Sequence, residues 1–393
     1  MNPDNSVKKL NKYRISTRRD EDCLHKASVQ SDMGSKIETS IETPKEITQE
    51  LREKIWRRSH SLNSITAFDH SIKSFEKYLA SKNTTWQQSL QTPIETLDGF
   101  VSWLDTDHSA STTITYLSFA KKALKHLGAK IGSEEFKDRV TLPKKRPFQD
   151  DKVTKDQIRR IMLELHHMGL KALLMLMKDT QARPAELLGL QISDLNLSYD
   201  PPYLNIPAER AKNDLPRELF FTQETKEMLI SFIKKKERQQ GQFIFLSDNI
   251  DPQDELAVQK RIKTVHGDMK AAFRKLMSGP GFADMNERIR QRGAMPRYKL
   301  HIYSFKKFAF TVMADTLGEI AARAIKGDRE YVLTYYRKNR EERAEDYRKV
   351  VLKISVFSSD ETPSAREEIE AKIKSMGQDE LAKLQEFLKT ASA

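Results

Sequence analysis

The stretch that decides the fold is TQARPAELLGLQISDL, which occupies residues 180–195. Arg183 stands directly before a proline, Glu186 follows three residues later, and leucines dominate the rest. Another helical turn is predicted after Arg183. An arginine and a glutamate at this spacing often pair across one helical turn and add little stability. The spacing alone therefore leaves the role of Arg183 open.

The residues after this stretch predict a small hairpin. Residues 203–206 and 219–222 favour strands, and Lys212-Asn213-Asp214 between them is typical of a turn. Helices are predicted near residues 155–169, 170–180, 223–239, 254–277, 303–316 and 318–325, and a short late strand is predicted at Ile354, Val356 and Phe357. The fold class that follows is mainly α with a small β-hairpin, an α+β protein.

The first third of the chain has the pattern of a small all-helical domain. Apolar residues from Ile65 to Leu79 fall at spacings of three and four, which places them on one helix face. Two further helices are predicted near residues 94–104 and 114–127. The predicted organisation is a flexible basic tail (1–45), a helical domain (46–140), a basic linker (141–153), a larger domain (154–358) and a helical tail (359–393).

Two groups of basic residues are candidates for contact with DNA. Lys121, Lys122 and Lys125 lie on the third predicted helix, and Lys144, Lys145 and Arg146 lie between two prolines in the linker. The chain has 68 Lys and Arg against 56 Asp and Glu, a net charge of +12. Such an excess suits a polyanion such as double-stranded DNA. The alternative for the helix lysines is an ordinary solvated face.

Several classes of protein are disfavoured by what the sequence lacks. Cys23 is the single cysteine, so neither an intramolecular disulfide nor a paired-cysteine metal site is possible. The histidines form no His-x-x-x-His metal pair, and no Walker loop, dinucleotide fingerprint or Gly-x-Ser-x-Gly elbow occurs. No apolar run has transmembrane length and no secretory signal is present. The expectation is a cytoplasmic, nucleoid- or DNA-associated protein without metal, cofactor or membrane partner.

The motifs together resemble the tyrosine recombinase or phage-type integrase family, closest in style to archaeal integrases. Residues 180–195 resemble the first catalytic-arginine motif, and residues 207–222 resemble the lysine hairpin. Residues 299–313 resemble the helix that carries His-x-x-Arg, and residues 327–338 resemble the Gly-His box followed by the nucleophilic tyrosine. Residues 46–130 resemble the core-binding domain. The resemblance covers about residues 50–355.

This sequence departs from the family pattern at three positions. The favoured register puts Tyr303 where the family has histidine and Lys306 where it has the second arginine. In the alternative register His301 is the family histidine, and Ser304 then fills the arginine position. Asp328 follows Gly327 where histidine or tryptophan is usual, and it needs a cationic partner such as Arg323 or Arg329. The departures bear on catalysis more than on fold or DNA binding.

The resemblance implies a site-specific recombinase or integrase that acts as a homo-oligomer, a tetramer, on DNA. Its site would comprise Arg183, Lys212, Tyr303, Lys306, Asp328 and the nucleophile Tyr336. Tyr335 is the alternative nucleophile, and one of the two tyrosines is expected to face the core. Such a protein typically belongs to a mobile element. The alternatives are a catalytically impaired relative that binds DNA and a basic helical protein without strand chemistry.

Overall fold

The computed structural model describes residues 45–145, 153–212, 214–247, 250–289, 297–331 and 335–357. All of these residues belong to a single compact unit. The predicted basic tail before residue 45, the predicted tail 359–393 and Arg146 lie outside the described residues.

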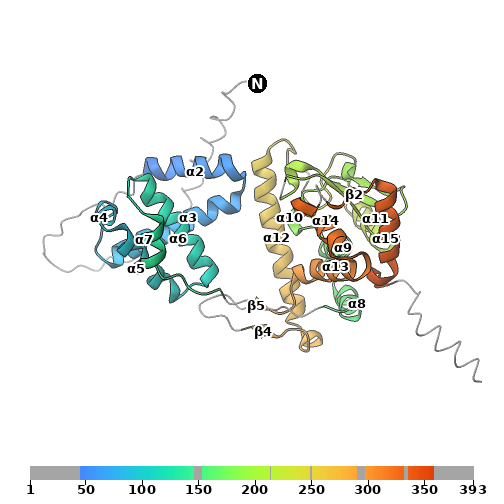
Figure 1. The fold of residues 1–393 in the computed structure, drawn as a ribbon. Coiled ribbons are helices and arrows are strands. Elements are labelled where there is room, and N and C mark those ends of the chain that lie inside the picture. The colour runs from blue at the N-terminus through green and yellow to red at the C-terminus, as the bar shows by residue number, and fades with distance from the viewer. Residues whose placement is uncertain are drawn as a thin grey trace, which may run out of the picture. The chain divides into compact units, whose positions relative to one another are not determined.

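The N-terminal helices form around a core of their own (Figure 1). They are α2 (Lys45–Ser59), α3 (Leu62–Ser81), α4 (Trp86–Gln91), α5 (Pro93–Asp105), α6 (Ala110–His126) and α7 (Ser133–Arg139). Local sequence sets their limits: the Ser61 side chain accepts the N–H of Ser64 at the start of α3, and Gly128, with φ of +98°, follows the end of α6. The predicted face of α3 is buried, with Phe68, Phe75 and Leu79 inaccessible to solvent.

The larger helical part surrounds α9, which is buried over nearly its whole length and packs against α10, α11, α12 and α13. The helices here are α8 (Lys155–Glu164), α9 (Met168–Thr180), α10 (Pro184–Leu188), α11 (Gln223–Lys235), α12 (Glu255–Met277), α13 (Ile302–Leu317), α14 (Glu319–Lys326) and α15 (Arg340–Ile354). A helix that is apolar on every side belongs in the centre of a core. Gln181, the residue that follows α9, is itself buried. The motif that begins at Arg183 is therefore attached to the buried end of this helix.

A small antiparallel sheet follows α10, in the order β1 (Leu195–Asn196), β2 (Tyr203–Ile206) and β3 (Arg217–Phe220). Tyr203 pairs with Phe220, and Ile206 pairs with Arg217. A second pair, β4 (Arg288–Ile289) and β5 (Arg297–Tyr298), was not predicted. The predicted mainly helical fold with a small hairpin is confirmed, although the return strand begins at Arg217 and not at Leu219.

Two predictions about the secondary structure are wrong. The first predicted helix of the larger part ends at Glu164, and α9 begins at Met168, because the His167 ring accepts the N–H of Leu170 and caps a new helix. Ile354 does not belong to a strand but ends α15, which the sequence analysis did not identify. Asn339 and Glu342 exchange side-chain and backbone hydrogen bonds of 2.8 Å at the start of that helix.

Candidate functional site

Arg183 lies at the N-terminus of α10, where the chain leaves the buried end of α9. Its backbone N–H donates to Glu186 Oε2 at 2.8 Å, and its Nη1 donates to Glu186 Oε1 at 3.1 Å. The Glu186 side chain is only 2% exposed, whereas that of Arg183 is 21% exposed. The pair is therefore partly buried, and the guanidinium keeps an accessible side.

Glu186 connects this motif to both ends of the hairpin turn. Its Oε1 accepts the backbone N–H of Lys212 at 3.2 Å, and its Oε2 accepts Nη2 of Arg217 at 2.8 Å. Burial alone would raise the pKa of Glu186, but Arg217, Arg183 and the two backbone N–H groups outweigh it and hold that pKa below its usual value. The Lys212 backbone is thus held by Glu186 while its side chain is exposed.

Lys306 and Tyr303 reach the same group of charges from α13. Lys306 Nζ donates to the carbonyl oxygen of Gln181, two residues before Arg183. Burial first, and the neighbouring Arg183 second, lower the pKa of Lys306 to about 7. Burial raises the pKa of Tyr303, and Arg183 partly offsets this rise. Both side chains therefore lie within electrostatic reach of Arg183.

The two residues of the alternative register are engaged at the start of α13. The His301 N–H donates to Ser304 Oγ at 3.1 Å, and Ser304 Oγ lies 3.3 Å from His301 Nδ1. Ser304 is buried. A serine that caps a helix in this way stabilises the helix end and offers no charge. The geometry thus groups Tyr303 and Lys306, and not Ser304, with the charges around Arg183.

Two residues that the sequence analysis did not single out also face this group. Arg217 of β3 pairs with Glu186 and is 9% exposed. His266 of α12 has its ring centroid 6.4 Å from that of Tyr303, and its Nε2 is buried without a hydrogen-bond partner among the described residues. Burial, with Lys270, lowers the pKa of His266 to about 4, so the imidazole is neutral at pH 7. Neither residue belongs to a local sequence pattern, because each owes its position to packing between distant segments.

Asp328 follows Gly327 in a turn after α14, and one of its two expected partners, Arg323, is present, although a closer cation was not expected. Lys326 Nζ lies 2.7 Å from Asp328 Oδ2, and Arg323 Nη1 lies at 4.0 Å. The carboxylate is thus paired chiefly with Lys326, a residue that the sequence analysis did not name, while Arg323 is a longer contact. Its negative charge is balanced locally.

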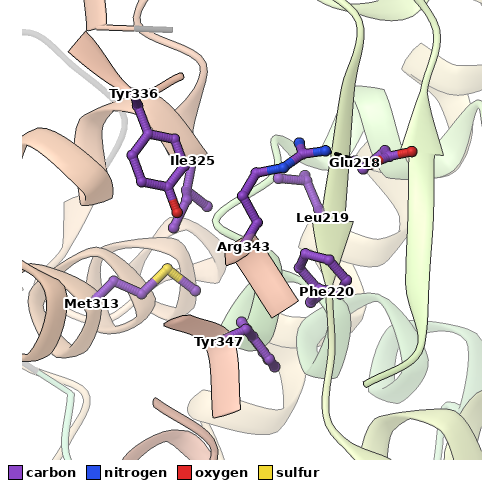
Figure 2. A pocket seen from close by; sticks show the side chains of 8 residues that line it. All are labelled: Glu218, Leu219, Phe220, Met313, Ile325, Tyr336, Arg343 and Tyr347. Carbon is purple, nitrogen blue, oxygen red and sulfur yellow. Dashed lines mark hydrogen bonds and ion pairs between the residues drawn. The ribbon is translucent and has the colours of Figure 1, made fainter. Parts of the chain in front are cut away.

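Tyr336 belongs to a second group of side chains. Its hydroxyl donates to Asp346 Oδ2 at 3.1 Å, and Asp346 also contacts Lys338. Figure 2 shows the phenol directed towards Ile325 and Met313 in a pocket. The other lining residues are Glu218, Leu219, Phe220, Arg343 and Tyr347. Burial and Asp346 raise the pKa of Tyr336. The Tyr336 hydroxyl thus bonds to α15, and the residues that line the pocket with it come from β3, α13, α14 and α15; Arg183 is not among them.

Tyr335 is 57% exposed, whereas Tyr336 is half-buried. The backbone N–H of Tyr336 donates to the Tyr331 carbonyl, five residues earlier, at 3.0 Å. The two neighbouring tyrosines thus differ in exposure, and the less exposed one is Tyr336, the residue predicted to be the nucleophile.

The candidate DNA-binding lysines differ in their surroundings. Lys121 Nζ lies 3.2 Å from the centroid of the Phe136 ring, and Lys122 Nζ lies 5.3 Å from that of Phe119. Burial lowers the pKa of Lys121. Lys125, Lys144 and Lys145 are exposed. Lys121 is therefore partly committed to packing within its own domain.

Within the described ranges, no three His, Cys, Asp or Glu side chains gather in a way that could hold a metal ion. Nor does any helix described here combine the length and apolar character needed to cross a membrane.

Comparison with known structures returns DNA-recombining proteins at low identity. The integrase of the Tn1549 transposon in complex with transposon right-end DNA is 14% identical, with a TM-score of 0.48, over 77% of this chain and 98% of that one. A lambda integrase dimer bound to a COC' core site is 13% identical, with a TM-score of 0.46, over 76% and 99%. XerA recombinase is 16% identical, with a TM-score of 0.34, over 85% and 99%.

The comparison of the sequence with family models is more specific. Residues 151–278 match the phage integrase family. No curated protein gives a significant match. The matched residues include Arg183, Glu186, Lys212 and Arg217, the centre of the site described above. Residues 151–278 are therefore similar to the phage integrase family.

Proposed function

We propose that this protein is a site-specific DNA recombinase that cuts and rejoins strands through a 3′-phosphotyrosine intermediate. The observation that carries the proposal is the grouping of Arg183 and Lys306 around buried Glu186, within and beside the domain that matches the phage integrase family. Cations fixed at one place, with a guanidinium that keeps an accessible side, suit a phosphodiester.

The chemistry of strand cleavage calls for such an arrangement. Attack of a tyrosine oxygen on phosphorus adds negative charge to the non-bridging oxygens, and preorganised cations stabilise it. The phenolic proton passes to water, the phosphorus–oxygen bond to the 5′ side breaks, and the departing 5′-oxygen takes a proton. We assign the charge stabilisation to Arg183 and Lys306, the nucleophile to Tyr336 and the proton to Lys212, whose side chain is exposed on the hairpin. Tyr303 and Asp328 complete the proposed site.

Specific observations favour a second candidate, a catalytically impaired relative that still binds DNA. Lys306 offers a point charge where an arginine would offer two aligned donors. The Asp328 carboxylate is paired with Lys326, and the Tyr336 hydroxyl donates a hydrogen bond to Asp346. A protein of this second kind would bind DNA through its basic residues and would not cleave a strand.

A nicked suicide substrate separates the two candidates. Cleavage of such a duplex releases a short fragment, so religation fails and the protein stays attached to DNA. The recombinase is expected to yield a covalent protein–DNA species that survives denaturing electrophoresis. Retention of the duplex without that species would favour the impaired relative.

We further propose double-stranded DNA as the partner and a homotetramer as the assembly on it. Residues 46–140 would form the core-binding domain, residues 141–153 a basic linker and residues 154–358 the catalytic domain. The net charge of +12 and the exposed Lys125, Lys144 and Lys145 support this assignment. These roles make the protein DNA-associated in the cell.

Binding to duplex DNA is expected to weaken steeply with salt, because each neutralised phosphate releases condensed counterions. Lys125→Ala should reduce the slope of log affinity against log salt by about one unit. Lys137→Ala is the matched control, since Lys137 pairs with Glu134 at 3.1 Å on a neighbouring helix. Fluorescence anisotropy across a salt series measures both. An affinity that hardly changes with salt would contradict the DNA assignment.

Lys306→Arg is expected to change the pH profile of cleavage. With a pKa of about 7, Lys306 loses its positive charge as the pH rises through neutrality, whereas arginine stays charged. The kcat/KM of the wild type should therefore fall above about pH 7, and that of Lys306→Arg should stay level up to about pH 9. Lys353→Arg, at an exposed position of α15, serves as the control. Identical profiles for Lys306→Arg and the wild type would remove Lys306 from the site.

A further inference from the structure

Arg217 is a buried arginine whose position the proposed chemistry does not use. It lies at the start of β3, and its side chain is 6% exposed. Nη2 donates to Glu186 at 2.8 Å. Its Nε and Nη1 are buried, and neither has a hydrogen-bond partner within the described part of the chain. A charged group buried in this way is costly unless it is paired, so the contact with Glu186 is what holds it.

The other side of the Arg217 guanidinium is covered by Gly327. This glycine has a φ of +87°, and a Cβ added to it would lie 2.8 Å from Nη1 and 2.9 Å from Cζ of Arg217. A real Cβ could not occupy that position, and the backbone angle itself disfavours other residues. Gly327 is therefore required by the close approach of the turn to the arginine. The turn leads from α14 towards Tyr336.

The contacts of Arg217 make it a link between three segments. Glu186 binds Arg183 on one side and Arg217 on the other, and it also holds the backbone of Lys212. Gly327 then rests on the far side of Arg217. The arginine motif, the lysine hairpin and the turn before Tyr336 thus share one buried ion pair.

Charge also distinguishes the two arginines. Glu186 carries one negative charge and has two arginines beside it. Because the buried Arg217 balances this carboxylate, the charge of the more accessible Arg183 is left for an incoming phosphate. Without Arg217, Arg183 alone would neutralise Glu186, and an approaching anion would meet one positive charge fewer.

We infer that Arg217 is a positioning residue that balances Glu186 so that Arg183 remains available to the scissile phosphate. The inference rests on the proposed recombinase function and deepens it. Arg217 also acts on Lys306 through space, because its positive charge is among those that lower the pKa of Lys306. Removing that charge should let Lys306 hold its proton to higher pH, which a purely structural residue would not do.

The test compares Arg217→Met, which removes the charge, with Arg217→Lys, which keeps it. The readout that does not depend on catalysis is the titration of Lys306 in full-length protein with ¹³C-labelled lysine, assigned with Lys306→Arg. The Lys306 midpoint should rise in Arg217→Met and stay near the wild-type value in Arg217→Lys. The matched control is Arg210→Met, which breaks an Arg–Asp pair of 2.8 Å in the same hairpin region and should leave the midpoint unchanged.

Cleavage of the suicide substrate supplies the second readout. Arg217→Met is expected to lose at least tenfold in single-turnover cleavage with less than a threefold loss in duplex affinity. Wild-type cleavage in a folded Arg217→Met protein, or an unchanged Lys306 midpoint, would overturn the inference. If the wild type forms no adduct, the proposed function fails, while the titration still decides the role of Arg217.

Arg217→Met can lose the fold, since it leaves Glu186 with less compensation. Circular dichroism and thermal unfolding detect this. In that case Gly327→Ala and Arg217→Lys carry the test, because both disturb the same guanidinium position while they keep a positive charge. Each should slow cleavage at least threefold, with duplex affinity changed less than twofold. Wild-type rates in both variants would refute the inference.

Discussion

Tyr336→Phe is expected to abolish the covalent protein–DNA adduct while duplex affinity stays within about twofold of the wild type. The substitution removes the phenolic oxygen and leaves the ring that fills the pocket against Ile325 and Met313. Loss of a nucleophile typically costs three orders of magnitude or more in rate, about 10³-fold at the least. The measurement is adduct formation on a nicked suicide duplex, followed by denaturing electrophoresis.

Tyr335→Phe is the matched control, since it removes the same atom from the adjacent and exposed ring. It should trap DNA as the wild type does. The opposite outcome, a dead Tyr335→Phe beside an active Tyr336→Phe, would move the nucleophile by one position. Adducts in both variants would place the nucleophile elsewhere in the chain.

The structure adds a condition to this expectation. Tyr336 donates to Asp346, and burial together with that carboxylate raises the pKa of Tyr336. A phenol held in this way is a poor nucleophile, because desolvation and a neighbouring negative charge both disfavour the phenolate. Attack on a phosphate near Arg183 therefore requires the Tyr336 hydroxyl to leave Asp346.

Local patterns predicted the parts of the site that depend on neighbouring residues. A helical turn was predicted after Arg183, and the contact of Arg183 with Glu186 across α10 is present at 3.1 Å. The hairpin was predicted because strand-forming residues flank turn residues, and β2 and β3 differ from the prediction only in their limits. Each of these features is encoded within a few residues, so sequence alone was sufficient.

Contacts between distant segments were the part that the sequence could not supply. Arg217 lies 31 residues from Glu186, and its position against Gly327 depends on how α14 packs. The direction of Tyr336 depends on Asp346 of α15, a helix that was not predicted because its apolar residues are sparse among charged ones. Neither contact has a local signal in the sequence, because arginine and aspartate lie mostly on solvent-exposed surfaces.

The pairing of Lys306 also depends on the tertiary structure. The register of the motif aligned this lysine with a phosphate-binding arginine. In the structure its Nζ donates to the carbonyl oxygen of Gln181, and Arg183 is close enough to lower its pKa. Its lowered pKa follows from burial, which a register cannot reveal. The alignment of Lys306 with the motif thus came from the sequence, whereas the lowered pKa of this lysine did not.

Arg183→Ala is expected to cost about 3 kcal/mol in the cleavage step, a fall of about 100-fold or more in single-turnover rate. Arg183 is the more accessible arginine of the pair around Glu186, so its charge is the one that a phosphate can reach. Duplex affinity should fall far less, because many other phosphate contacts contribute to binding.

Two comparisons make this prediction specific. Arg183→Lys keeps the charge but loses the planar fork, so its cleavage rate should lie between those of Arg183→Ala and the wild type. Thermal unfolding reports the cost of leaving Glu186 with one partner fewer; Arg217 and the backbone N–H of Lys212 remain in place, and the fold should persist. Equal losses in cleavage and in affinity would show instead that Arg183 serves binding or structure, because a group that stabilises only the transition state acts on the rate alone.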